Sequence, residues 1–459
     1  MNTIMTNRLN PVVKDKVGQT ELLVHDQDPD GLQGMMPLLG MRGWNHHFFI
    51  VFTFISLLML FAAASEVRGE KFETPRNRNV SDILPAEMIK GPHYRIRDKV
   101  VSYGYMHHFT VDSDFGVFEV TGDGALRKLL KEIKAIAALK EIQKSKAYLD
   151  SVKKAGKMPF EFGKNLIQEP VDTISGIPKG VYRLFGNIAT SITETHDPSE
   201  DARAKQALAV SAYKRDYAYE LGVDVYSSNS VLQKELNRLG WAGAIGGLSL
   251  TAITFPAQAP VVKVAKTMRF SKQLDEILRE EPPSRLRIIN EEKLLAMGVS
   301  KNLANKYLDH PSFTPRHDTI IAECLATLKD ARGRDTFIKF ALSAEDEESA
   351  NFLQNMTETM GGYHETVSPI TDIRVVAGMV FAKAKNGSAL VPFPLDHGVW
   401  SKQPDRIFRE VVSSPSASGL KGNIALWVTG TVSSMARKQL GQLGIGVVEN
   451  VDERIEFLD

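Results

Sequence analysis

A run of 17 residues without a charged side chain, Phe48 to Ala64, constrains this chain more than any other feature. Arg42 stands before the run, and three alanines end it directly before Ser65, which places small residues where a signal peptidase cleaves. A helix that spans a bilayer needs about 20 apolar residues, so the run is slightly short for a full span. The sequence therefore predicts a cleaved export signal, with a single-span membrane anchor through residues 48–64 as the alternative.

The residues before Met41 are unusual for the start of an export signal because they are rich in aspartate, as in VHDQDPDG. A start codon assigned too far upstream explains them, and a cytoplasmic tail on an anchored protein is the alternative. In both cases residues 1–64 comprise an upstream extension and the signal or anchor. We expect the remaining chain to act in the periplasm, in the cell envelope or outside the cell.

The composition is that of an ordinary globular protein, with 43% hydrophobic and 24% charged residues among 459. A net charge of +1 argues against a nucleic-acid partner, because proteins that bind nucleic acids usually carry a large excess of positive charge. Cys324 is the single cysteine, so an exported form has no internal disulfide bond. Its stability must come from buried cores, which a chain of this length can form.

The patterns after the signal predict an α+β fold. Residues 65–92 are polar and irregular, which is typical of a linker. Residues 93–285 combine a small β-sheet, amphipathic helices and a glycine-rich apolar segment. Short capped helices in 286–368 predict a helical bundle, and strands alternate with helices in 369–459. The predicted architecture is a mainly α-helical middle region between a small N-terminal antiparallel β element and a C-terminal α/β domain.

Two patterns define this C-terminal domain. IRVVAGMVFAKA and SALVPF flank Asn386-Gly387, a pair that favours positive φ and predicts a hairpin between them. GNIALWVTG, TVSSMARKQLGQLG and IGVVENV then follow as strand, helix and strand. Short loops in that order predict two parallel strands joined by a helical crossover.

Apolar residues recur every three or four positions along a predicted helix that begins at Asp123. Its other face is rich in lysine, including Lys128, Lys131 and Lys134, with few acidic residues between them. A basic amphipathic helix can bind an anionic bilayer surface. For the helix itself, the pattern favours packing on the preceding sheet with the lysines in solvent, and binding to a bilayer is the alternative.

A second charge-free stretch lies between Arg238 and Lys263 and contains the apolar segment 241–255. At 15 residues, this segment is shorter than a membrane span and is more typical of a buried core helix. Membrane insertion is the alternative, because glycine-rich faces allow helices to approach closely in a bilayer. In that alternative, Trp241 and Phe255 contact the membrane or a partner.

The nucleotide-binding motif G-x-x-x-x-G-K-[ST] and the nucleophile motif G-x-S-x-G are both missing. Ser151 and Lys154 have the S-x-x-K spacing, but they lie at the lysine-rich end of an amphipathic helix, where such a match easily arises by chance. His107 and His108 are neighbours on a predicted strand and face opposite sides, so they cannot share a metal ion. The sequence predicts no cofactor and no metal site. Asp396 and His397, in a polar cluster after a predicted strand, are the candidate catalytic residues.

The favoured hypothesis is an exported, non-enzymatic protein associated with the cell envelope. In this hypothesis the lysine face and the apolar segment contact an anionic membrane surface or an envelope protein. A secreted or periplasmic hydrolase, with a site in the C-terminal α/β domain, is the alternative. The sequence does not identify a substrate or an oligomeric state.

Overall fold

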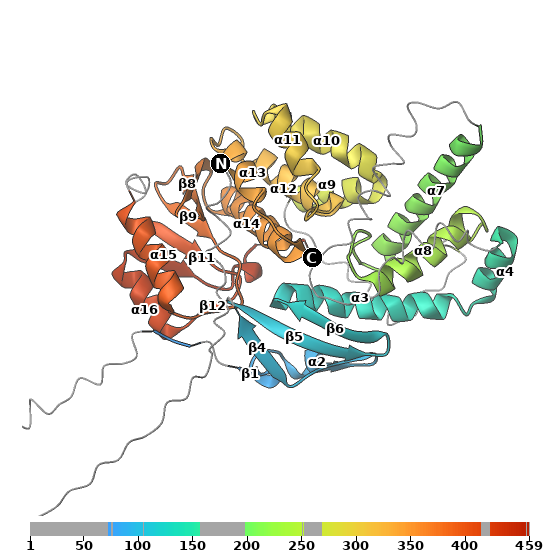
Figure 1. Ribbon diagram of the computed structural model, residues 1–459, viewed down its shortest axis with the longest axis horizontal. Helices are drawn as coiled ribbons and strands as arrows, with labels where there is room; N and C mark the ends of the chain where they lie inside the picture. Colours follow the sequence, from blue (N-terminus) through green and yellow to red (C-terminus); the bar gives the residue numbers. More distant parts are fainter. Residues whose placement is uncertain are drawn as a thin grey trace, which may run out of the picture. The chain divides into compact units, whose positions relative to one another are not determined.

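The computed structural model describes residues 72–74, 77–103, 105–156, 198–249, 251, 269–414, 423–455 and 457–458, with the backbone alone at 103, 198–206, 269–273 and 275. The predicted signal, the residues before it and Phe255 lie outside the described residues. From Phe72 onward the described residues belong to one compact unit, Glu70–Asp459. The fold is α+β, as predicted, with an antiparallel sheet, a helical middle and a C-terminal α/β region (Figure 1).

The N-terminal sheet has the strand order β1-β4-β5-β3-β2, and β6 pairs with the free side of β5. All of these pairings are antiparallel. Along β5, His107, Phe109 and Val111 are buried and alternate with more exposed residues, so one face of the strand meets the core. The strands are β1 (Arg78–Asn79), β2 (Lys90–Gly91), β3 (Tyr94–Ile96), β4 (Lys99–Tyr103), β5 (Met106–Ser113) and β6 (Gly116–Thr121).

Part of the segment predicted as a linker packs under this sheet. A 3-10 turn at Val80–Asp82 and the short helix α2 (Ala86–Ile89) precede β2. Val80 and Leu84 are buried in the same core as Phe109. The boundaries predicted for the domains are not tested by this observation and stay predictions.

Helix α3 (Asp123–Ile142) packs in two cores, as its apolar spacing requires. Its first half, with Leu126 and Ile133, covers the N-terminal sheet. Its second half, with Leu139 and Ile142, packs with α4, α7 and α8. These helices are α4 (Lys146–Ala155), α7 (Pro198–Glu220) and α8 (Ser230–Ala244).

The structure describes the glycine-rich segment at 241–249 and 251, and its first part, 241–243, is buried. A Cβ added at Gly243 would lie 2.4 Å from the Tyr213 ring, so glycine is needed for α8 to approach α7 closely. Trp241 and Leu248 are 5% and 1% exposed. Close packing thus accounts for Gly240, Gly243 and Gly246 in this part of the chain.

The helical middle forms the largest core, which it shares with one face of the C-terminal sheet. Ile320, Phe337 and Met360 contribute from three of its helices, and Val380 contributes from the sheet. The helices are α9 (Arg269–Glu280), α10 (Pro283–Ala296), α11 (Lys301–Leu308), α12 (Pro315–Thr327), α13 (Arg334–Ala341) and α14 (Glu347–Thr366).

The C-terminal sheet has the order β13-β11-β9-β8-β7, with β7, β8 and β9 antiparallel and β9, β11 and β13 parallel. Helices α15 and α16 pack on one face and the middle helices on the other (Figure 1). The parallel pair β11 and β13, joined through α16, confirms the predicted crossover. The elements are β7 (Ile370–Val376), β8 (Met379–Ala384), β9 (Ala389–Pro392), β10 (His397–Gly398), α15 (Lys402–Ser413), β11 (Ile424–Trp427), β12 (Thr431–Val432), α16 (Ser434–Gln442), β13 (Ile445–Val448) and a 3-10 turn at Val451–Glu453.

One strand prediction in this region was incomplete. The stretch IRVVAGMVFAKA is itself a hairpin, because Ala377 and Gly378 have φ values of 50° and 77° and reverse the chain between β7 and β8. Two consecutive residues with positive φ form the tight turns that join antiparallel strands. The hairpin predicted at Asn386-Gly387 also forms, between β8 and β9.

None of the helices among the described residues has both the length and the apolar character of a membrane-spanning segment.

A buried lysine between α7 and α8 leads to a prediction about stability. Lys214 is 5% exposed, and its Nζ donates to Gln233 Oε1 at 3.1 Å. No carboxylate among the described residues forms an ion pair with it. Burial lowers the pKa of its ammonium group to about 8. At pH 7 the group is still mainly charged, but its charged form is less favourable in the folded protein than in the unfolded chain.

We expect Lys214→Met to raise the free energy of unfolding at pH 7 by about 2 kcal/mol, since methionine fills the space of the lysine stem without a charge. Above about pH 8 the folded parent loses this proton while the unfolded chain still holds it. The stability of the parent therefore rises with pH, and the advantage of the variant shrinks. Urea titrations at pH 7 and pH 10 measure both effects. Lys301→Met, at an exposed position, is the control; an equal gain in that variant would contradict the explanation.

Candidate functional site

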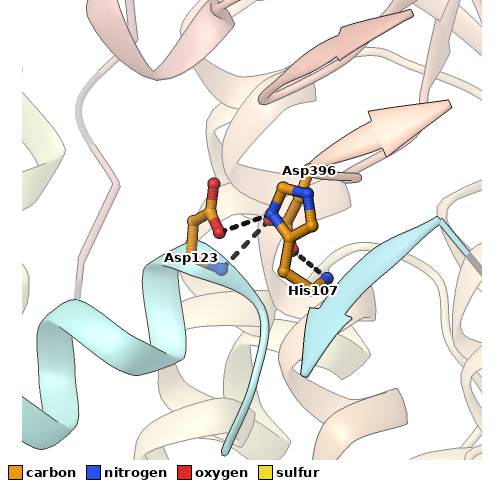
Figure 2. A group of neighbouring side chains, drawn as sticks. All are labelled: His107, Asp123 and Asp396. Atoms are coloured by element: carbon orange, nitrogen blue, oxygen red, sulfur yellow. Dashed lines mark hydrogen bonds and ion pairs between the residues drawn. The ribbon is translucent and has the colours of Figure 1, made fainter. Parts of the chain in front are cut away.

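Three polar side chains from distant parts of the chain meet where the N-terminal sheet contacts the C-terminal α/β region (Figure 2). His107 lies on β5, Asp123 is the first residue of α3, and Asp396 lies in the loop between β9 and β10. One nitrogen or oxygen of each side chain lies within 4.8 Å of those of the other two. We call these residues the His107–Asp123–Asp396 cluster.

Local structure brings the first two members together. The alternation of β5 turns the His107 side chain toward the core. Gly122 has a φ of 99°, which allows the chain to turn sharply from β6 into α3, and its N–H donates to the His107 carbonyl oxygen at 2.8 Å. This turn places Asp123 beside the histidine.

Asp396 joins the cluster through the backbone of the other two members. Its carboxylate accepts hydrogen bonds from the N–H of His107 at 2.7 Å and from the N–H of Asp123 at 3.1 Å. The N–H groups of Asp396 and His397 in turn donate to the Tyr105 carbonyl oxygen, each at 3.1 Å. The loop after β9 is thereby fastened to β5 and to the N-terminus of α3.

The imidazole ring of His107 is 3% exposed and faces both carboxylates. Its Nδ1 lies 2.9 Å from Asp123 Oδ1 and 3.8 Å from Asp396 Oδ2. Because Nδ1 faces two acceptors, we assign the ring proton to it and a hydrogen bond to Asp123. Nε2 is buried without a hydrogen-bond partner among the described residues, so no nucleophile stands beside the ring.

Negative charge dominates this site. Burial, and then the neighbouring Asp123 carboxylate, raises the pKa of Asp396 to about 6, although two backbone N–H groups and His107 act in the opposite direction. Among the described residues, no lysine or arginine forms an ion pair with Asp123 or Asp396. An imidazole nitrogen with two carboxylates is a ligand set that divalent metal ions use.

The two residues predicted as catalytic candidates have different partners. Asp396 binds the backbone of His107 and Asp123, whereas His397 Nδ1 lies 2.8 Å from Thr431 Oγ1. No hydrogen bond joins Asp396 to His397. Burial lowers the pKa of His397, which favours its neutral form. These neighbours in sequence therefore do not form a hydrogen-bonded acid–base pair.

The predicted lysine face of α3 is not uniformly accessible. Lys128 is mostly buried, and its Nζ lies 3.1 Å from Asp224 Oδ2. Lys131 is half-buried, and Lys134 is exposed. Of the three lysines predicted to contact a membrane or a partner, Lys134 is thus the most available.

A more open basic surface lies on the next helix. Lys146, Leu149 and Lys153 of α4 occur at positions i, i+3 and i+7, which brings them to one side of the helix. All three are exposed, and Leu149 is 48% exposed. We call them the α4 basic face. Lys144 and Lys154, which are also exposed, lie next to it in the chain.

Trp241 is 5% exposed, so a membrane or partner contact through its side chain would require α8 to move from its place in the fold. Phe255 lies outside the described residues. The predicted contacts at these two residues stay predictions.

Sequence reasoning missed His107 and Asp123 as site residues. Their separation of 16 residues matches no metal-binding motif, and Asp396 lies 289 residues beyond His107. The available signal was indirect: a buried strand position and an aspartate directly after a glycine at the start of a helix. That signal places the two residues near each other but does not identify Asp396 as their partner.

Comparisons of this chain with protein-family models, with curated proteins and with solved structures find no match. Function must therefore be inferred from the residues and their geometry.

Proposed function

We propose that this protein is exported and binds the anionic surface of a membrane in the cell envelope, in a non-enzymatic role. The apolar run 48–64 supports export, because Arg42 precedes it and it has the length and the terminal small residues of a secretory signal. The single observation that carries the membrane role is the α4 basic face, where an exposed leucine stands between two exposed lysines.

The charge of this surface favours an anionic bilayer over a neutral partner. Along α3 and α4, exposed lysines outnumber exposed acidic residues such as Glu141. Lys153 has only a loose contact of 3.8 Å with Asp150, and both side chains are solvated. The exposed lysines are Lys134, Lys144, Lys146, Lys153 and Lys154.

The magnitudes are sufficient for reversible binding. A lysine close to an anionic leaflet contributes about 1 kcal/mol of attraction, and burying a leucine side chain contributes about 2 kcal/mol. Lys144 forms an ion pair with Glu141 at 2.6 Å. The other four exposed lysines and Leu149 together correspond to roughly 6 kcal/mol before the loss of side-chain freedom is considered. Such binding would be peripheral and sensitive to salt.

The hydrolase alternative has less support. Asp396 and His397 bind separate partners, and the ring of His107 has no nucleophile beside it among the described residues. A general acid–base pair requires hydrogen-bond reach between its members and the reacting group.

We expect the double substitution Lys146→Gln and Lys153→Gln to lower partitioning onto vesicles that contain phosphatidylglycerol by roughly 30-fold, because two contributions of about 1 kcal/mol are removed. Leu149→Gln should lower partitioning by a comparable factor, because it removes the contribution of about 2 kcal/mol from the buried leucine side chain. Vesicle sedimentation at low salt measures both effects.

The matched control is Lys301→Gln with Lys438→Gln, which removes the same charge from exposed positions on α11 and α16. Equal losses in both double variants would indicate a general charge effect and contradict a specific α4 surface. Fractionation of cells, with N-terminal sequencing of the recovered protein, tests export separately. Recovery of an intact N-terminus in the cytosol would contradict it.

A further inference from the structure

We propose that the His107–Asp123–Asp396 cluster binds one divalent metal ion of the Zn²⁺ type, which links β5, the start of α3 and the loop after β9. His107 Nδ1, Asp123 Oδ1 and Asp396 Oδ2 are its ligand atoms. The site is independent of the membrane role proposed above, and its failure would leave that role unaffected.

The spacing of the ligand atoms fits one ion. Nitrogen and oxygen ligands bind Zn²⁺ at about 2.0–2.2 Å, so two ligands at a tetrahedral angle stand roughly 3.4 Å apart. Nδ1 lies 2.9 Å from one carboxylate oxygen and 3.8 Å from the other, and all three atoms lie within 4.8 Å of one another. Small shifts of the Asp123 side chain, which is 28% exposed, would complete the geometry.

Charge balance is an independent argument. Two carboxylates, one of them almost fully buried, stand together, and no lysine or arginine among the described residues pairs with either. Buried charges are normally paired with an opposite charge or bound to a metal ion. A neutral histidine cannot balance two carboxylates, whereas a divalent cation balances both.

The two backbone hydrogen bonds to Asp396 can remain when a metal ion binds, whereas the ion replaces the hydrogen bond between His107 Nδ1 and Asp123 Oδ1. A carboxylate offers about four lone-pair positions, and Asp396 uses two of them for the N–H groups of His107 and Asp123. The ion would take the Nδ1 lone pair, and the ring proton would pass to Nε2. The Asp396 carboxylate would thus be oriented by two backbone N–H groups before the ion arrives.

The test is Zn²⁺ binding by the full chain after EDTA treatment, measured by calorimetry. We expect one tight site per chain, and we expect His107→Gln and Asp123→Asn each to lower its affinity at least tenfold. His108→Gln is the matched control, because this neighbouring histidine points to the other face of β5 and contacts Thr121. Binding to that variant should match the parent within twofold.

Co²⁺ absorption in the visible range provides a second readout that does not depend on stability. The band should be lost in Asp123→Asn and retained in His108→Gln, and circular dichroism in EDTA should show that both variants are folded. Zn²⁺ should also raise Tm in the parent and not in His107→Gln. The proposal is overturned if Zn²⁺ does not bind, or if the affinity is unchanged in both ligand variants.

Discussion

Asp396→Ala should lower the free energy of unfolding by about 4 kcal/mol, because it leaves two backbone N–H groups without their acceptor in a largely buried place. Those groups belong to His107 and Asp123, at 2.7 and 3.1 Å from the carboxylate. The loss is partly offset, since the substitution also removes the repulsion between Asp396 and Asp123 that raises the pKa of Asp396. Urea unfolding in EDTA measures the effect without any metal contribution.

Two other variants make this experiment specific. Asp396→Asn keeps one acceptor oxygen and should have an intermediate effect. Asp112→Ala, on the same strand β5, removes an exposed carboxylate that binds Arg97 and should cost less than about 1 kcal/mol. If Asp396→Ala lowered the free energy of unfolding no more than Asp112→Ala does, the Asp396 carboxylate would not be what holds the loop after β9.

Asp224→Ala should be equally damaging, with a loss of about 4 kcal/mol, because it removes the carboxylate of a buried ion cluster. Asp224 is 6% exposed and lies 3.1 Å from Lys128 Nζ and 3.9 Å from Arg316 Nε. It also accepts the N–H of Tyr226 at 2.8 Å. Burial alone would raise its pKa, but the two cations outweigh burial and lower it.

The sign of this pKa shift predicts a pH dependence. Because the folded state holds the carboxylate ionised, its contribution is present above the ordinary pKa of aspartate and is lost as the pH falls through the lower folded value. The difference in stability between the parent and Asp224→Ala should therefore shrink in acid. Unfolding by urea at pH 7 and at pH 3 measures that difference.

A double-mutant cycle with Lys128→Met isolates the ion pair. We expect a coupling energy of about 2 kcal/mol, so that the double variant is less damaged than the sum of the two single variants. Additive effects would mean that Asp224 acts mainly through Tyr226 and Arg316.

The prediction of α3 shows how far sequence patterns can reach. Its apolar spacing correctly identified a long helix packed on the preceding sheet, because burial of one face imposes a period near 3.6. The same pattern could not distinguish Lys128 from Lys134, since both lie opposite the main apolar residues. Only the position of Asp224, which is 96 residues away from Lys128, draws one lysine inward and leaves the other in solvent.

The strand patterns of the C-terminal region were similarly informative. Alternation and the pair Asn386-Gly387 predicted one hairpin, and strand–helix–strand order predicted the parallel pair β11 and β13. The turn at Ala377-Gly378 was missed because alanine seldom adopts a positive φ. Its conformation is maintained by the pairing of β7 with β8 rather than by its own preference.

The site was the least accessible feature. Asp396 and His397 were identified as candidates from a polar cluster in the sequence, which gave no indication of the partners of either side chain. In the folded chain the Asp396 carboxylate turns toward His107 and Asp123, which lie 289 and 273 residues away.

The amino-acid sequence by itself determined the class of fold, the amphipathic helices, the hairpins and the run that predicts export, because each depends on residues within about 20 positions of one another. The tertiary structure alone decided which polar groups meet. A buried polar group binds whichever partner lies near it in space. The hydrogen-bond and ion-pair partners of Asp396, Asp224 and Lys214 therefore depend on how whole elements pack together.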